Sequence, residues 1–145
     1  MRRITAVIAL VLGLSACTPT QYARYLAAIP VIGQETADQV AADYFAQKAA
    51  AIEGRPCAEW YDLAIEAGFT PEQWREPVSR IMWGESRCNP LADSPISSAR
   101  GLMQHLSWWA PRCGGTYEDL HDPTFSLRCA YKTYQDQGWG AWSAF

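Results

Sequence analysis

The sequence predicts a small, mainly α-helical domain with several short helices, at most a small β-hairpin, and disulfide cross-links. Apolar residues recur at helical spacing in short segments, and prolines and glycines separate these segments. All seven tryptophans fall between Trp60 and Trp142, so most of the packed core is expected there. A domain of about ninety residues buries a modest fraction of its surface, so cross-links between its cysteines would help to stabilise it.

The first 16 residues have the pattern of an export signal. Arg2 and Arg3 give a positive start, and the apolar run that follows is too short to span a bilayer. The segment from Leu14 to Cys17 resembles the lipobox of bacterial lipoproteins, in which cleavage leaves an acylated N-terminal cysteine. Residues 1–16 are therefore expected to be a lipoprotein signal peptide, and Cys17 the lipidation site. An ordinary cleaved signal that contains a cysteine is the alternative.

The lipid on Cys17 would hold the exported protein on a membrane, either on the outer side of the cytoplasmic membrane or in the cell envelope. Loss of Arg2 and Arg3 with the signal leaves 10 basic against 15 acidic residues, a formal charge of about −5. An acidic protein does not attract the phosphates of nucleic acid, so no nucleic-acid partner is expected.

The other cysteines form an even set, which favours two disulfides in an exported protein. They are Cys57, Cys88, Cys113 and Cys129. Four cysteines allow three pairings; local helix packing favours Cys57 with Cys88 and Cys113 with Cys129. Zinc is a weaker interpretation, because the chain has no Cys-x-x-Cys pair and its two histidines lack zinc-ligand spacing. We therefore expect no metal and no cofactor.

Residues 17–53 are expected to carry the lipid anchor, a tether and an alanine-rich helix. Residues 18–32 are mixed in character and contain two prolines, which indicates the tether. Residues 36–52 are rich in alanine and other good helix formers, and Gly54 and Pro56 end the helix. The packed domain is then expected to span residues 54–145.

The first helices of this domain carry clear local signals. Trp60, Leu63, Ala64 and Ala67 lie at helical spacing, and a glycine follows as a natural C-cap. Residues 70–73, Thr-Pro-Glu-Gln, combine a capping residue, a proline at the first helical position and a glutamine three residues after the cap. This combination predicts a second helix start.

The next helix places a carboxyl group beside the core. Val78, Ile81, Met82 and Glu85 follow the i, i+3, i+4, i+7 pattern, so they share one helix face. Burial and the negative end of the helix dipole both raise the pKa of a carboxyl group at the C-terminal end of a helix. Glu85 is thus a candidate general acid, which glycoside cleavage requires.

The second half of the domain is more irregular. Asn89 and Pro90 end the helix, and residues 91–106 are rich in serine, proline and glycine, which predicts turns or a short irregular hairpin. Ser107 is expected to cap a short helix. Asp122 and Pro123 open a last helix that ends before Gly138.

Three segments of the domain resemble the successive motifs of lytic transglycosylases with a lysozyme-like fold: Glu85–Pro90, Ala99–Gln104 and Ala130–Tyr131. The family pattern is Glu-Ser, a variable stretch that ends in Asn-Pro, and then a Gly-Leu-Met-Gln turn. The resemblance covers roughly residues 81–131, and the flanking parts of the domain look like those of small actinobacterial members.

The resemblance implies an enzyme that cleaves the β-1,4 bond between N-acetylmuramic acid and N-acetylglucosamine in peptidoglycan glycan strands. It makes Glu85 the catalytic acid and base, and it implies 1,6-anhydromuramoyl products without hydrolysis. It also implies that Ser86, Met103, Gln104 and Tyr131 line or support the sugar-binding groove. Met103 would equally serve as a core side chain.

Two alternatives remain open at this stage. Many family members carry a Tyr-Asn motif near the end of the domain, where this chain has Trp139-Gly-Ala-Trp142, so the product chemistry is open. One alternative is a muramidase, because a second carboxylate such as Asp93 would favour hydrolysis. A non-catalytic glycan-binding lipoprotein of the envelope is the other alternative, against which the intact Glu85 argues.

Overall fold

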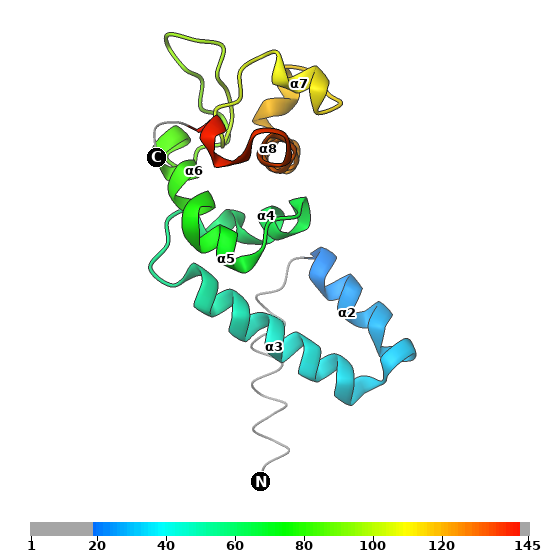
Figure 1. Ribbon diagram of the computed structural model, residues 1–145. Helices are drawn as coiled ribbons and strands as arrows, with labels where there is room; N and C mark the ends of the chain where they lie inside the picture. The colour runs from blue at the N-terminus through cyan, green and yellow to red at the C-terminus, as the bar shows by residue number, and fades with distance from the viewer. Residues whose placement is uncertain (1–18, 143–145) are drawn as a thin grey trace. The chain divides into compact units, whose positions relative to one another are not determined.

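The computed structural model describes residues 19–142, and it confirms a mainly α-helical, lysozyme-like fold (Figure 1). The predicted signal peptide and Cys17 lie outside the described residues. The chain divides into two compact units, of which the first ends at Ala50 and the second begins at Ala51. Within residues 19–142, no helix is long and apolar enough to cross a membrane.

The described part of the first unit consists of α2 (Pro19–Ile32) and most of α3 (Gln34–Ile52), whose last two residues belong to the second unit. The segment predicted as an alanine-rich helix lies within α3, and the segment predicted as a tether forms the helix α2. Its internal proline, Pro30, lacks a backbone N–H and so cannot donate to the carbonyl oxygen four residues earlier. Tyr25 on α2 donates to Asp38 on α3 (2.5 Å), a contact between helices that local sequence rules do not reveal.

The second unit begins with short helical segments that the sequence signals predicted well. They are η1 (Ala58–Trp60), α4 (Tyr61–Ala67), α5 (Pro71–Gln73), a π-helical turn η2 (Trp74–Val78) and α6 (Ser79–Ser86). Thr70 and Gln73 form the predicted capping box, in which each side chain accepts a hydrogen bond from the backbone N–H of the other residue. Gly68 caps α4 as expected.

The rest of the unit consists of an irregular loop and four further helical segments. These are α7 (Trp109–Arg112), η3 (Glu118–His121), α8 (Pro123–Gln137) and η4 (Gly138–Ala141). Asp122 caps α8 as predicted, because its side chain accepts from the backbone N–H of Phe125 (2.7 Å). The hairpin is reduced to isolated bridges that pair Arg100 with Asp93 and with His105.

The core of this unit forms where α4 and η4 pack on α8, and where η2 packs on α6. Its largest fully buried side chains include Trp74, Tyr61, Phe69, Ile81, Met82, Leu102 and Met103. A further cluster joins Trp109 and Ala110 of α7 to Leu120 and Cys129. Aromatic bulk fills this small core, as the tryptophan distribution predicted.

Both preferred disulfides are present, one between Cys57 and Cys88 and one between Cys113 and Cys129. The first joins the start of the unit to the residues that follow α6. The second joins the end of α7 to the middle of α8. The pairing is confirmed, and each bridge connects elements that adjoin the loop carrying residues 89–108.

Candidate active site

Glu85 lies in the last turn of α6, directly above the core. Val78, Ile81 and Met82 on the same helical face are at most 1 % exposed, as the spacing predicted. The Glu85 side chain is half-buried at the edge of this apolar face. The helix therefore presents its carboxyl group at the boundary between core and solvent.

Burial raises the pKa of Glu85 above its ordinary value. The carbonyl groups at the C-terminal end of a helix also disfavour a negative charge there. Within residues 19–142, Glu85 has no hydrogen-bond or ion-pair partner that would stabilise its charged form. The carboxyl group is thus held in a state that favours retaining its proton, which suits a general acid.

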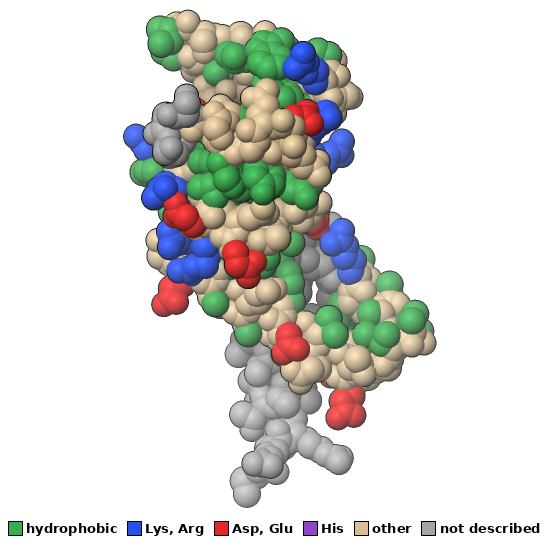
Figure 2. Space-filling model, in the orientation of Figure 1, with side chains coloured by type: hydrophobic (Ala, Val, Ile, Leu, Met, Phe, Trp, Pro, Cys, Tyr) green, Lys and Arg blue, Asp and Glu red, His purple; other side chains and the backbone are tan. Residues whose placement is uncertain are grey.

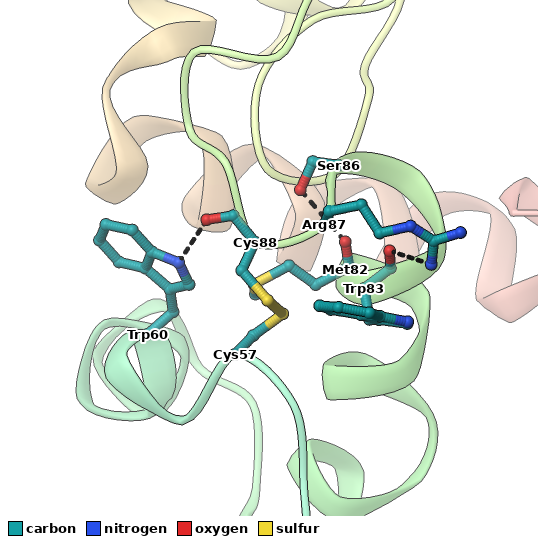
Figure 3. The surroundings of a disulfide bond; sticks show 7 residues. All are labelled: Cys57, Trp60, Met82, Trp83, Ser86, Arg87 and Cys88. Atoms are coloured by element: carbon teal, nitrogen blue, oxygen red, sulfur yellow. Dashed lines mark hydrogen bonds between the residues drawn. A yellow bond between two sulfur atoms is a disulfide. The ribbon is translucent and has the colours of Figure 1, made fainter.

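The chain after Glu85 is fixed in place by several contacts (Figure 3). Arg87 and Cys88 both adopt left-handed backbone conformations, with φ of 55° and 64°, which end α6 abruptly. The disulfide to Cys57 holds Cys88, whose carbonyl oxygen accepts from Trp60 Nε1 (3.0 Å). Left-handed conformations are unfavourable for these residue types, so the surrounding contacts must stabilise them.

Ser86 faces the interior of the unit. It is 6 % exposed, and its hydroxyl group donates to the carbonyl oxygen of Met82 one turn earlier (3.1 Å). This bond lies within α6 and holds the last turn together (Figure 3). Because its hydrogen is used in this bond, Ser86 Oγ could only accept a hydrogen bond from a ligand. Its contact with substrate stays a prediction.

The Gly-Leu-Met-Gln segment forms a tight turn between two paired residues. Arg100 and His105 exchange backbone hydrogen bonds of 3.0 and 3.1 Å, and residues 101–104 form the turn between them. Gly101 has a φ of +80°, and a Cβ there would lie 2.0 Å from the carbonyl oxygen of Leu120. Only glycine fits this position, because both the conformation and the close backbone approach exclude a side chain.

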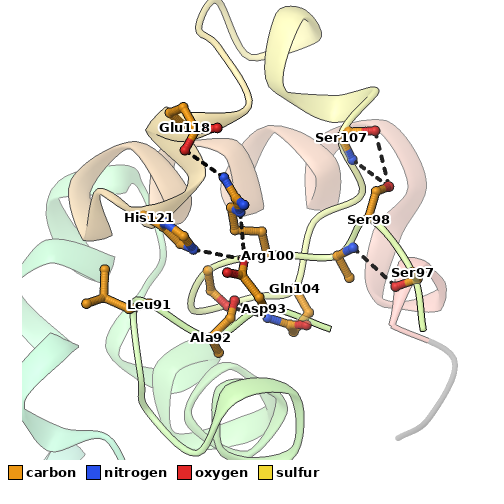
Figure 4. A network of polar contacts seen from close by, with 12 residues as sticks. Leu91, Ala92, Asp93, Ser97, Ser98, Arg100, Gln104, Ser107, Glu118 and His121 are labelled. Atoms are coloured by element: carbon orange, nitrogen blue, oxygen red, sulfur yellow. Dashed lines mark hydrogen bonds and ion pairs between the residues drawn. The ribbon is translucent and has the colours of Figure 1, made fainter. Parts of the chain in front are cut away.

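Gln104 leaves the turn with its amide group in a defined orientation. Its Nε2 donates to the carbonyl oxygens of Ala92 (3.0 Å) and Gly101 (3.0 Å), so both hydrogens of the amide are engaged (Figure 4). The side chain is half-buried, and its Oε1 is left to accept. The φ of 49° at this residue is again left-handed.

Backbone hydrogen bonds connect the end of α6 to Gln104. The N–H of Asn89 donates to Ser86 (3.1 Å), and that of Ala92 donates to Asn89 (3.3 Å). The carbonyl oxygen of Ala92 then accepts from Gln104 Nε2. The structure thus brings the segment after Glu85 and the Gly-Leu-Met-Gln turn together, as two parts of one connected loop.

Met103 and Tyr131 lie deeper in the unit. Met103 is fully buried, and its carbonyl oxygen accepts from Trp142 Nε1 (3.0 Å). Tyr131 on α8 contacts Phe69 edge-on and lies where a Cβ at residue 68 would be. Within residues 19–142, no hydrogen bond or ring contact joins Tyr131 to Glu85 or Gln104. Met103 is therefore a supporting side chain, and contact of Tyr131 with substrate stays a prediction.

Asp93 belongs to a polar network that the sequence did not reveal (Figure 4). Arg100 donates from Nε to Asp93 (2.6 Å) and from Nη1 to Glu118 (2.8 Å), while its guanidinium lies 3.9 Å from the centre of the Tyr117 ring. His121 Nε2 is 3.0 Å from Asp93 Oδ1. The hydrogen bond from Arg100 lowers the pKa of Asp93, followed by the one from His121. Arg100 thus joins the loop to η3, and the motif at residues 99–104 contains Arg100 but did not reveal these contacts.

The described residues offer no obvious place for a metal ion. Within residues 19–142, no group of three or more His, Cys, Asp or Glu side chains is arranged to hold one. His105 is 3 % exposed, and burial lowers its pKa from 6.5 to about 4, so its imidazole is neutral at physiological pH. Its Nε2 pairs with the hydroxyl group of Thr133 (3.1 Å).

A mainly α-helical unit with a half-buried glutamate at a helix end and a tight glycine turn in the connected loop fits the lysozyme-like fold class. The family model described as the transglycosylase SLT domain matches residues 62–137, which is more than half of the chain. The chain therefore belongs to the transglycosylase SLT domain family. Searches among curated proteins and among solved structures gave no match. The matched region contains Glu85, the glycine turn and Tyr131.

Proposed function

We propose that this protein is a peptidoglycan lytic transglycosylase with Glu85 as its catalytic acid and base. It would cleave the β-1,4 bond between N-acetylmuramic acid and N-acetylglucosamine. The observation that carries the proposal is the carboxyl group of Glu85, which burial at the end of α6 keeps protonated to higher pH than usual. Membership of a transglycosylase family supplies the class of reaction and the polymer.

The proposed reaction uses one carboxyl group twice. Glu85 donates its proton to the glycosidic oxygen, the bond from this oxygen to C1 of the muramic acid breaks, and an oxocarbenium-like centre develops at C1. The Glu85 carboxylate then takes the proton of the C6 hydroxyl group while O6 forms a bond to C1. The products are a 1,6-anhydromuramoyl end and a free N-acetylglucosamine end. Glu85 returns to its protonated form, and no water is consumed.

Gln104 is proposed to bind the sugar through Oε1. Since both amide hydrogens are directed to Ala92 and Gly101, the side chain can only accept a hydrogen bond from a hydroxyl or an N-acetyl N–H. Met103, and Ser86 through its bond within α6, would support the site from beneath. Tyr131 is proposed to line the site from α8.

Asp93 is a poor candidate for the second carboxylate of a muramidase. Arg100 and His121 both contact its Oδ1, and these hydrogen bonds lower its pKa. A carboxylate that activates water must take a proton from it, and a carboxylate with a lowered pKa is a weaker base. The network thus supports the lytic reaction over hydrolysis through Asp93. The non-catalytic alternative leaves the raised pKa of Glu85 without a role.

Export and lipid attachment at Cys17 complete the proposal. They would bring the enzyme to the envelope, where its peptidoglycan substrate lies. The lipobox-like segment before Cys17 supports this localisation. So do the four remaining cysteines, which pair in two disulfides.

Replacement of Glu85 tests the catalytic assignment. Glu85→Gln keeps the shape of the side chain but removes the proton that is donated, so release of soluble fragments from peptidoglycan should fall by about 10²-fold to 10⁴-fold. Glu72→Gln, an exposed glutamate on α5, is the matched control and should retain full activity. Unchanged fragment release by the Glu85→Gln protein would remove Glu85 from its role.

A further inference from the structure

The structure separates the tryptophans into buried and exposed side chains. Trp109 and Trp142 are 5 % and 6 % exposed and belong to the core, whereas Trp108 is 44 % exposed. The ring of Trp108 stacks on that of Trp109, with centroids 4.8 Å apart and planes inclined by 28°. An exposed indole is thus supported from behind by a buried one.

The guanidinium of Arg112 lies beside this stacked pair. Its Cζ atom is 4.7 Å from the centre of the Trp108 ring and 5.7 Å from that of Trp109. These two separations and the 4.8 Å between the rings are similar, so Arg112 lies at the side of the pair and not opposite Trp109. Trp108 thus remains 44 % exposed, and the guanidinium of Arg112 lies near its ring.

Ser107, the residue before Trp108, forms a pair of hydroxyl groups with Ser98. Ser98 Oγ accepts from the backbone N–H of Ser107 (3.2 Å) and lies 3.1 Å from Ser107 Oγ (Figure 4). Of the two hydroxyl hydrogens, one serves the bond between them. The other has no acceptor among residues 19–142, so the pair can donate to a ligand next to Trp108.

We propose that Trp108, with Arg112 and the Ser98–Ser107 pair, forms a subsite for one N-acetylhexosamine ring of the glycan strand, away from the bond that is cleaved. A pyranose ring has an apolar face of C–H groups that packs on an indole, and equatorial hydroxyls that point sideways. The serine pair would donate to such a hydroxyl, and Arg112 to the carbonyl of the acetamido group. This inference rests on the proposed function.

The subsite lies within reach of the proposed cleavage site. Trp108 follows Gln104 by four residues, so their Cα atoms are at most about 14 Å apart. Gln104 is hydrogen-bonded to the loop that follows Glu85. Figure 2 shows hydrophobic side chains gathered with a basic one over the region where α7 lies in Figure 1. A polymer bound at Gln104 can extend over this surface.

Trp83 provides a matched comparison within the same unit. It is 45 % exposed, and Arg87 lies 4.9 Å from the centre of its ring, so exposure and charge are the same as at Trp108. Trp83 is two residues before Glu85 on α6, which places it on the opposite side of the helix. The exposure of a tryptophan is therefore not, by itself, the basis of the proposed subsite.

Binding of full-length protein to insoluble peptidoglycan tests the subsite without turnover. In a Glu85→Gln background, cosedimentation should show that Trp108→Ala weakens binding by about fivefold, while Trp108→Phe retains most of it. Trp83→Ala should bind like the Glu85→Gln parent. Thermal melting of each variant checks that it remains folded. Trp108→Phe, which keeps an aromatic ring, provides a second variant for the test if the alanine variant does not remain folded.

Kinetics with Glu85 intact give the second readout. Trp108→Ala should raise KM for long glycan strands severalfold with kcat nearly unchanged, and the effect should vanish for fragments too short to reach Trp108. The subsite would be overturned if Trp108→Ala bound peptidoglycan as well as its parent, or if Trp83→Ala lost as much binding as Trp108→Ala. Turnover by the Glu85→Gln protein would instead contradict the proposed catalytic residue and leave the binding result standing.

Discussion

At the scale of single residues, position within a helix decides the protonation of the key carboxyl group. Glu85 is set at the end of α6 on an apolar face, and burial raises its pKa. Asp93, only a few residues away, is exposed and bound to Arg100, so its pKa is lowered. The pKa values of two carboxyl groups close in sequence are thus shifted in opposite directions. Enzymes use such shifts to give different chemical roles to side chains of the same type.

The raised pKa of Glu85 predicts how activity and stability change with pH. Cleavage should decline as pH rises through this pKa, because the proton donor is lost. The folded state holds the proton above pH 4.5, where an unfolded glutamate loses it, so folding stability falls as pH rises through that interval. Glu85→Gln should therefore raise Tm at neutral pH and leave it unchanged below pH 4.5, as thermal melts would report. A Tm difference that is independent of pH would contradict the buried environment.

His105 should produce the opposite dependence. Its buried imidazole has a pKa of about 4 against 6.5 in the unfolded chain, so the unfolded state binds the proton first as pH falls. Stability should decrease by roughly 3 kcal/mol between pH 6.5 and pH 4. Urea titrations across this range should show that His105→Phe removes the decrease, though it lowers stability at pH 7 through loss of the Thr133 contact. A parallel decrease in the variant would assign the effect to other groups.

At the scale of elements, the turn at residues 101–104 packs the loop of residues 89–108 against η3. Gly101 permits this contact, because its Cα approaches the carbonyl oxygen of Leu120 more closely than any Cβ allows. Gly101→Ala should cost about 3 kcal/mol of folding stability. Gly114→Ala is the matched control, since its φ of +86° is nearly the same but no atom lies within 4 Å of an added Cβ. Equal losses in urea unfolding would mean that backbone conformation alone, and not the close contact, requires glycine.

Elements with local signals were predicted well from the sequence. The capping box at Thr70 and the Asp122–Pro123 start of α8 depend on neighbouring residues only, and both appear as expected. The helix α2 was missed, because its contact between Tyr25 and Asp38 joins distant positions. The short turns η3 and η4 also carried no recognisable signal.

The candidate site was predicted in part for the same reason. Helical periodicity placed Glu85 on the core face of its helix without knowledge of the fold. Other features of the site arise from contacts between separate segments. They are the orientation of the Gln104 amide, the hydrogen bond from Arg100 to Glu118 and the hydrogen bond from Trp142 to Met103. Composition likewise could not distinguish the exposed Trp108 from the buried Trp109.

At the scale of the whole molecule, the second unit contains everything that the proposed chemistry needs. Its disulfides and aromatic core hold the segment after α6, the end of α7 and the middle of α8 in place. The first unit, with α2 and α3, adjoins the predicted lipid site in sequence and lies outside the region that the family model matches. The proposed anchoring and the proposed catalysis thus belong to different parts of the chain.

The mass of the products tests the central claim most directly. Purified peptidoglycan digested by the protein should yield muramoyl fragments with 1,6-anhydro ends, which mass spectrometry distinguishes from hydrolysed ends by the mass of one water molecule. The account predicts anhydro products that are absent when Glu85→Gln protein is used. Fragments that carry the added water would contradict it and establish a muramidase.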